Sequence, residues 1–180
     1  MVSAAAWQGS AEATVVRAVP LGELVGMSEW VVVASVTSSR SHYETIGGSP
    51  RLVTDTLLQV DQALTQNQSR SGVETLTVTV RTLGGSVGDL AQYVPGEAIL
   101  GQGTRHVLFL DEGSDGVFRV AAMAQGQYPV ATDDRGNVTL RPSPGLDLVL
   151  NAEQSAVAVL AGRNVEQAQA LVQQNVRKMP

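Results

Sequence analysis

Alternating apolar and polar positions divide most of the chain into short predicted strands. The clearest alternation spans residues 75–83, where Leu76, Val78 and Val80 point one way and polar residues point the other. A period of two predicts a half-buried antiparallel strand. Residues 30–36 are apolar on both sides of the chain, which predicts a central strand of the sheet.

Further strands are expected at short spacing along the chain. Residues 52–64 predict a bent strand, in which Leu57 and Leu58 break the alternation and indicate a β-bulge. The other predicted strands are 105–110, 117–123, 127–131 and 138–140, and the turns 111–116 and 133–137 join them in pairs. Short strands separated by turn signals predict a closed barrel or a sandwich.

Polar and glycine-rich segments predict the connections between these strands. The main loops are expected at residues 38–50, 62–72 and 83–95. Gly101 and Gly103 precede a strand, so they cannot supply the helix N-terminus of a phosphate-binding loop. We interpret them as a turn.

Helices are predicted at the two ends of the sequence. Pro20 suits the start of a short helix, whose apolar face would carry Leu21, Leu24 and Val25 before Gly26 and Ser28 end it.

Asn151 and Asn164 each have Gln three residues later, a pattern close to a capping box, and they predict two C-terminal helices. Gly162 would end the first of these helices. The second carries an apolar stripe of Val165, Ala168, Val172, Val176 and Met179. We expect this stripe to pack on the barrel, and a partner chain is the alternative.

Together these elements predict a mainly β (α+β) fold. We expect a small antiparallel β-barrel with a short N-terminal helix and two C-terminal helices. The expected division is a disordered segment or signal-peptide remnant over residues 1–13, a barrel over 14–145 and a helical appendage over 146–180.

Composition excludes several classes of function. The net charge is −5 and the pI is about 4.9, so nucleic acid and anionic lipid are disfavoured partners. The chain has no cysteine, which excludes disulfides and thiolate chemistry. No stretch approaches the roughly 18 consecutive apolar residues that a membrane span requires.

The N-terminal residues resemble the end of a secretory signal. Ala4–Ala6 and the Ala11-Glu12-Ala13 triplet fit the apolar segment and the A-x-A cleavage pattern. This predicts a bacterial protein that is periplasmic or secreted.

Residues 84–88, Gly-Gly-Ser-Val-Gly, match the G-x-S-x-G pattern of serine hydrolases and follow a predicted strand. In those enzymes a helix begins directly after the serine, whereas Pro95 and Gly96 leave no room here for a useful helix. His106, the histidine downstream, lies on a predicted strand. We interpret the glycines as turn residues and retain hydrolysis by Ser86 as the alternative.

The other titratable residues form no recognisable site in the sequence. His42 and His106 are the two histidines, and neither has the ligand spacing of a zinc site. The acidic turns at 111–115 and 133–134 lack the register of a calcium loop, and turns favour Asp in any case. We therefore assign no catalytic, cofactor or metal residue.

Several segments resemble a group of uncharacterised, exported bacterial proteins of small β-barrel type. The segments that carry this resemblance are 30–36, 53–55, 83–88, 95–97, 107–110 and 124–128. The architecture of that group is similar to the OB-fold and to the netrin-like modules of metalloprotease inhibitors. The resemblance implies an exported module that accompanies secreted metalloproteases.

Two departures limit what this resemblance implies about activity. Netrin-like inhibitors chelate zinc through an N-terminal cysteine, which this chain lacks. OB-folds that hold single-stranded nucleic acid use exposed aromatic residues and a basic groove, and this chain is acidic and only 4% aromatic.

The resulting hypothesis is a non-enzymatic binding or accessory protein of the bacterial envelope or exterior, with a protein partner and no cofactor. The barrel loops would carry the binding surface. One form of the hypothesis is a partner or inhibitor of a co-secreted protease. The alternatives are a serine hydrolase that uses Ser86 and a protein that self-assembles through its C-terminal helices.

Overall fold

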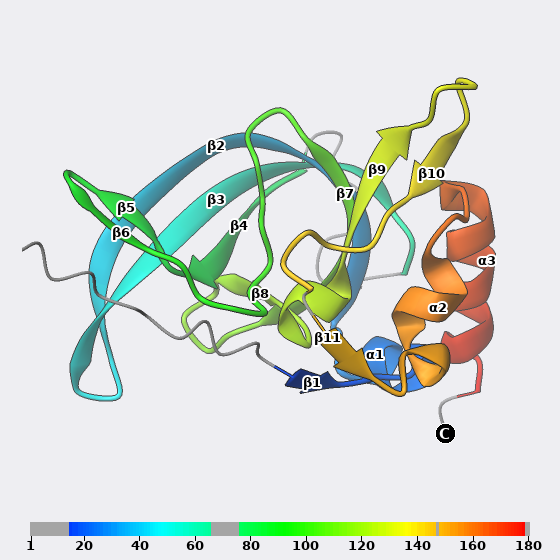
Figure 1. Cartoon of the computed structure of the whole chain (residues 1–180), viewed down its shortest axis with the longest axis horizontal. Helices are drawn as coiled ribbons and strands as arrows, with labels where there is room; N and C mark the ends of the chain where they lie inside the picture. The colour runs from blue at the N-terminus through cyan, green and yellow to red at the C-terminus, as the bar shows by residue number, and fades with distance from the viewer. Residues whose placement is uncertain (1–14, 66–75, 147, 179–180) are drawn as a thin grey trace, which may run out of the picture.

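The computed structural model describes residues 15–65, 76–146 and 148–178, and it shows a mainly β fold with a few helices (Figure 1). This confirms the predicted fold class. The strands are β1 (Val15–Arg17), β2 (Trp30–Ile46), β3 (Ser49–Ala63), β4 (Leu76–Leu83), β5 (Gly85–Val87), β6 (Leu90–Gln92), β7 (Arg105–Glu112), β8 (Phe118–Val120), β9 (Gln127–Thr132), β10 (Val138–Leu140) and β11 (Leu148–Leu150). The helices are α1 (Leu21–Gly26), α2 (Ala156–Leu160) and α3 (Val165–Val176), with 3₁₀ turns η2 (Met123–Gly126) and η3 (Ala152–Gln154).

Five strands close into a barrel in the order β7-β2-β3-β4-β8, with β8 pairing back onto β7. The pairing of β4 with β8 is parallel and joins Val80 to Phe118, whereas the other barrel pairings are antiparallel. Closure removes the free sheet edges that would otherwise invite aggregation. The result is an OB-like architecture, to which β9 and β10 are added beside β7.

The barrel interior is filled by the residues of one strand parity. On β2 this parity supplies Trp30, Val32, Ala34 and Val36, which face apolar residues of β4, β7 and β8. The ring of Trp30 packs against that of Phe118, with 6.2 Å between their centroids.

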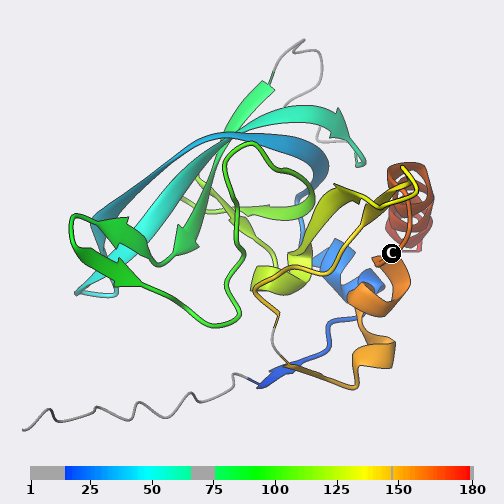
Figure 2. The same ribbon diagram turned by 45° about the horizontal axis from the view of Figure 1, so that its top comes forward.

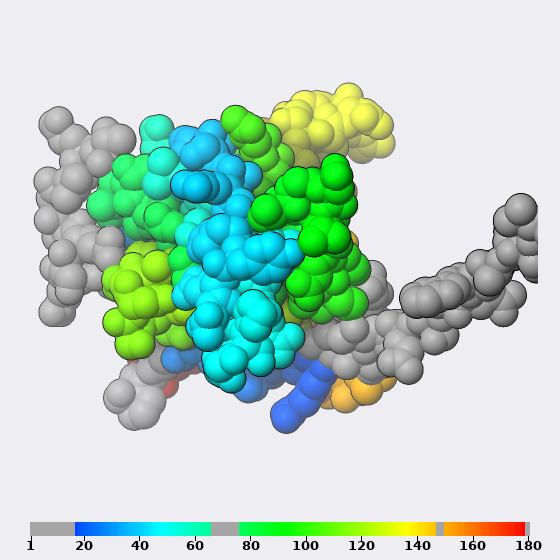
Figure 3. Space-filling model, turned by 90° about the vertical axis from the view of Figure 1, so that its left-hand side faces the viewer, coloured from blue at the N-terminus to red at the C-terminus, as the bar shows by residue number. Residues whose placement is uncertain are grey.

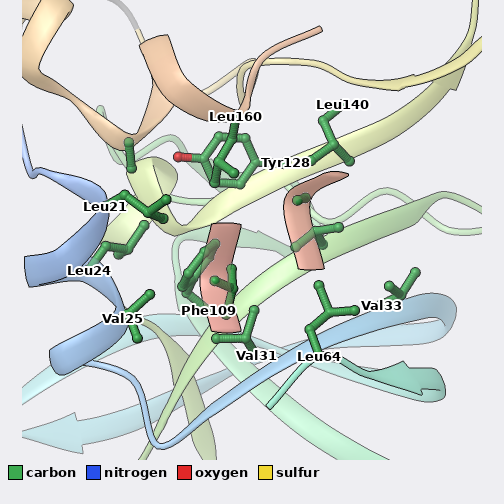
Figure 4. Close-up of a cluster of buried hydrophobic side chains, with 14 of the residues drawn as sticks. Leu21, Leu24, Val25, Val31, Val33, Leu64, Phe109, Tyr128, Leu140 and Leu160 are labelled. Carbon is green, nitrogen blue, oxygen red and sulfur yellow. The ribbon is translucent and has the colours of Figure 1, made fainter. Parts of the chain in front are cut away.

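The opposite parity of the same strands forms a second core beneath the helices (Figure 4). Val31, Val33 and Phe109 pack there against α1 and the C-terminal helices, and the ring of Phe109 meets Tyr128 edge-on. Residues 30–36 are apolar on both sides because each side faces a different core. This confirms that they form a central strand.

The predicted loop at residues 38–50 is wrong. β2 and β3 run on through it as a long hairpin, with paired residues from Ser39 opposite Thr56 to Ile46 opposite Ser49. The turn is Gly47-Gly48, and both glycines have positive φ, 59° and 79°. This is the backbone that two-residue hairpin turns require. The residues before the turn form a strand through this pairing, and they are polar because both faces of the strand are largely exposed.

The expected bulge lies on the partner strand. Val36 pairs with Leu58 and Ser38 pairs with Leu57, so the extra residue is Thr37 on β2. The Thr37 hydroxyl donates to the carbonyl of Leu57 at 2.9 Å. The adjacent leucines therefore mark the position opposite the bulge.

Both predicted Asp- and Gly-rich hairpins are present, β7 with β8 and β9 with β10. Asp133 fixes the second turn, because one of its carboxylate oxygens accepts from the backbone N–H groups of Arg135 and Asn137. The strand predicted at 117–123 is shorter than expected, since it ends at Val120 and η2 follows.

The helix predictions are partly correct. α1 follows Pro20, and Leu21, Leu24 and Val25 are buried as expected. Asn164 forms a complete capping box with Gln167 at the start of α3. Asn151 does not cap a helix with its side chain; it precedes η3 instead. The first C-terminal helix, α2, is capped by Ser155, whose hydroxyl accepts from the N–H of Ala158.

Candidate functional site

The G-x-S-x-G segment forms a small hairpin that lies against the barrel (Figure 2). Ser86 sits within β5, and β6 follows, so the strand-to-helix turn of a hydrolase is not formed here. The backbone N–H of Ser86 donates to the Ser41 hydroxyl at 3.2 Å. Ser41 also bonds the Thr54 hydroxyl, which donates to the carbonyl of Gly84. These bonds fix β5 to β2 and β3.

His106 lies inside the barrel, away from Ser86. Its Nε2 is 2.6 Å from the Thr104 hydroxyl, and its Nδ1 is 3.4 Å from the side-chain nitrogen of Gln127. Burial lowers the pKa of His106 to about 4, so the ring is neutral at pH 7. Gln127 in turn accepts from the N–H of Ile99 and the hydroxyl of Ser143. This network ties the segment before β7 to the barrel wall.

An ion-pair cluster lies on the outer face of β2, β3 and β4. Arg81 binds Asp55 with two hydrogen bonds, of 2.6 and 2.8 Å, and a third nitrogen contacts Glu44. His42 lies 3.8 and 3.9 Å from the same two carboxylates. The bonds from Arg81 hold the pKa of Asp55 below its usual value.

Sequence reasoning missed this cluster because its members come from three strands. One part of the cluster was visible in the sequence, because Arg81 lies on the polar side of the predicted strand 75–83. Its partner could not be predicted, because the β3–β4 register that sets Asp55 opposite Arg81 depends on contacts between residues far apart in the sequence.

The acidic turns are held differently. Asp115 pairs with Arg119 at 3.0 Å and also lies 3.7 Å from Arg81, at the edge of the ion-pair cluster, whereas Asp133 bonds within its own turn. In the described parts of the chain, no group of three or more His, Cys, Asp or Glu residues is arranged to hold a metal ion.

A cavity of about 340 Å³ lies at the mouth of the barrel, beneath the β5–β6 hairpin. Thr54, Thr56, Thr82 and Glu97 line it, together with apolar residues. Thr56 is 1% exposed, and its hydroxyl has no hydrogen-bond partner. Nothing in the sequence pattern pointed to this cavity, because Glu97 lies in an irregular segment.

The β2–β3 and β5–β6 hairpins adjoin at the barrel end away from the helices (Figures 1 and 3), and each carries exposed apolar side chains. We call this surface the hairpin face. It comprises Tyr43, Ile46, Val87, Leu90 and Tyr93.

The hairpin face carries two aromatic side chains that are far more exposed than the other described aromatic side chains. Tyr43 and Tyr93 are 53% and 62% exposed, whereas every other aromatic side chain whose burial is described is at most 3% exposed. Exposed apolar side chains are common at interaction sites, and tyrosine is enriched where partners bind. The predicted loops 38–50 and 83–95 lie side by side, since the N–H of Ser86 donates to the Ser41 hydroxyl, and both are largely β-hairpin. The tip of the third predicted loop, residues 66–72, lies outside the described residues.

The apolar stripe of α3 packs against the protein itself. Val165, Ala168 and Val172 are buried in the core beneath the helices, which confirms the expected packing. Val176 is exposed, and Met179 lies outside the described residues. The N-terminal residues 1–13, on which the export prediction depends, also lie outside them.

Neither a comparison with protein-family models nor a comparison with curated proteins found a match to this chain. The fold and the hairpin face define it as a small OB-like β-barrel with packed helices and an exposed aromatic end. Across the described parts of the chain, no helix combines the length and apolar character that crossing a bilayer demands.

Proposed function

We propose that this protein is a non-enzymatic binding protein of the bacterial envelope or exterior that recognises a protein partner through its hairpin face. The observation that carries the proposal is the placement of two exposed tyrosines, Tyr43 and Tyr93, among exposed aliphatic residues on adjoining hairpins. Burying such side chains against a partner would remove apolar surface from water.

The hairpin face is also held in place before any partner arrives. The Ser41 hydroxyl bonds both Thr54 and the backbone of Ser86, so the β5–β6 hairpin is fixed against β2 and β3. A surface that is already ordered loses less conformational entropy on binding than a mobile loop does.

The partner class that we propose is a co-exported protease, to which this barrel would act as an inhibitor or accessory module of netrin-like type. The chain contains no cysteine, so chelation of the protease metal by a thiolate cannot be its mechanism. Contact would instead be made by the apolar side chains of the hairpin face.

A pull-down from the native envelope fraction tests this proposal. The wild-type chain is expected to retain a partner, and a Tyr43→Ser/Tyr93→Ser double variant is expected to lose it. Val138→Ser is the matched control, because Val138 is also an exposed apolar strand residue but lies on β10. Recovery of no partner by the wild-type chain, or equal recovery by the double variant, would contradict the proposal.

The non-enzymatic part of the proposal has its own test. A panel of ester and peptide substrates is incubated with the wild-type chain and with Ser86→Ala. We expect no turnover by either. Turnover by the wild-type chain that the substitution abolishes would replace the binding function with that of a serine hydrolase.

A further inference from the structure

The cavity at the barrel mouth is formed by one patch of the β3–β4 ladder. Thr54 pairs with Thr82, and Thr56 pairs with Val80, so the three threonines are neighbours on the inward face. On one side of them the interior is filled by apolar residues, and residues of β5 and β6 line the other side of the cavity. The cavity is therefore the place where the barrel core changes from apolar to polar.

The hydroxyl of Thr56 is unsatisfied within the protein. It is buried and has no hydrogen-bond partner, whereas the neighbouring Thr54 hydroxyl bonds both Ser41 and Gly84. A buried hydroxyl without a partner costs stability, typically about 1–3 kcal/mol. Because Thr56 lines the cavity, a donor that reaches this oxygen from the cavity would give it a partner.

Glu97 brings a carboxylate to the same cavity. One of its oxygens accepts from the N–H of Leu83 at 3.1 Å, and the other accepts from the N–H of Ala98 at 2.9 Å. Burial raises the pKa of Glu97, and these two backbone bonds only partly oppose the shift. Each carboxylate oxygen can accept a further bond.

The remaining walls are mostly hydrocarbon. Ala91, Val94, Ala98, Ile99 and Leu100 supply them, and Tyr93 contributes at the exposed side. Such walls favour an alkyl chain over a strongly hydrated molecule. The volume suits a small group, since it lies at the lower end of the range for ligand pockets.

We propose that this cavity binds a protonated primary amine on an alkyl stem, the group presented by a lysine side chain or by a free alkylamine. An ammonium group has three donors, and the Glu97 carboxylate with the Thr56 and Thr82 hydroxyls provides oxygen acceptors for them. The alkyl stem then lies against the aliphatic walls. An anionic ligand is excluded by the carboxylate, and a neutral alcohol leaves that charge uncompensated.

The test is a titration of the ¹⁵N-labelled full chain with n-pentylamine near neutral pH, with 1-pentanol as the neutral analogue. The reporters are the backbone amides of Leu83 and Ala98, which donate to Glu97. We expect saturable shifts with pentylamine at a Kd on the order of 1 mM, and affinity for pentanol weaker by about tenfold.

Two variants make the test specific. Glu97→Gln removes the charge and is expected to abolish the preference for the amine. Thr56→Val keeps the shape and removes the unsatisfied hydroxyl, so it is expected to leave the protein folded and to weaken amine binding about fivefold.

A blocked tripeptide with a central lysine identifies the source of the amine. Tighter binding than pentylamine assigns the cavity to a lysine side chain, and equal or weaker binding assigns it to a free alkylamine. The absence of saturable shifts with both amines would overturn the proposal. Equal affinity for pentanol and pentylamine would also overturn it, and so would unchanged amine affinity in Thr56→Val.

Discussion

Gly85 approaches Thr54 so closely that a Cβ atom on Gly85 would fall 2.2 Å from the Thr54 hydroxyl oxygen and 2.4 Å from that of Ser41. A side chain at position 85 would therefore displace the β5–β6 hairpin from the barrel. This contact explains the glycine on the amino side of Ser86 by close packing.

The first prediction concerns this contact. Gly85→Ala is expected to destabilise the protein by roughly 2–4 kcal/mol, because the added methyl group clashes and the backbone has a φ of 125°. Gly88→Ala is the control, since its Cβ would meet nothing within 4 Å and only the positive φ is unfavourable, at about 1 kcal/mol. Urea unfolding measures both. Equal losses in the two variants would contradict the packing argument.

The second prediction concerns pH. An unfolded chain protonates His106 near pH 6.5, whereas the folded protein resists protonation until about pH 4. The unfolded state therefore binds more protons between these values, and stability falls as the pH drops through this window, by about 3 kcal/mol in full. Unfolding by urea at several pH values checks this.

The matched variants separate the two histidines. His106→Gln should flatten the loss of stability between about pH 6.5 and pH 4, since Gln does not titrate there. His42→Gln should leave that loss in place, because His42 is on the outer face and partly exposed. A pH profile that changes only in His42→Gln would contradict the assignment.

The third prediction concerns Arg81. Replacing it with Met removes the two hydrogen bonds to Asp55, so the pKa of Asp55 should rise toward its usual value. The depressed pKa stabilises the fold above about pH 4 and that contribution is lost in acid, so the variant should lose stability at neutral pH. We expect a loss of about 1 kcal/mol, because the pair is partly exposed.

Carboxyl-selective NMR titration measures the pKa of Asp55 directly. Arg105→Met is the control, because Arg105 pairs at 2.9 Å with Asp61, which lies six residues from Asp55 along β3 and makes no bond to Arg81. An Asp55 pKa that does not change in Arg81→Met would show that the ion pair is not formed in solution.

The fourth prediction concerns Tyr128. Its ring packs against Phe109 in the core beneath the helices, and its hydroxyl is buried without a hydrogen-bond partner. Tyr128→Phe removes that hydroxyl and keeps the ring, so stability should be unchanged or higher by about 1 kcal/mol. Tyr93→Phe, on the surface, should change stability by less than about 0.5 kcal/mol. A large loss in Tyr128→Phe would mean that the hydroxyl has a partner.

The barrel could be predicted from the sequence where burial imposes a period. Val78 and Val80 alternate with polar residues because only one side of β4 faces the core. Residues 30–36 lack alternation because both sides are buried, and a short run of apolar residues predicts such a central strand. Residues 38–46 could not be predicted as a strand. Both faces of the extended hairpin are largely exposed to solvent, so its sequence shows no alternation of apolar and polar residues.

The caps and the sites show a second limit. Asn164 and Asn151 have the same local pattern, but only the Asn164 side chain caps an α-helix, because α2 begins later, after its own cap Ser155. The hairpin face and the cavity depend on which strands meet, such as Thr56 opposite Val80. Register of this kind is decided by the packing of distant residues, which a single sequence does not display.

The most direct test of the proposed function is photo-crosslinking from the hairpin face in the native envelope fraction. A benzophenone amino acid replaces Leu90, which is 65% exposed and leaves both tyrosines intact, or Val138 on β10 as the control. The account predicts a discrete crosslinked protein from position 90 and none from position 138. Crosslinks from position 138 alone, or from neither position, would contradict it.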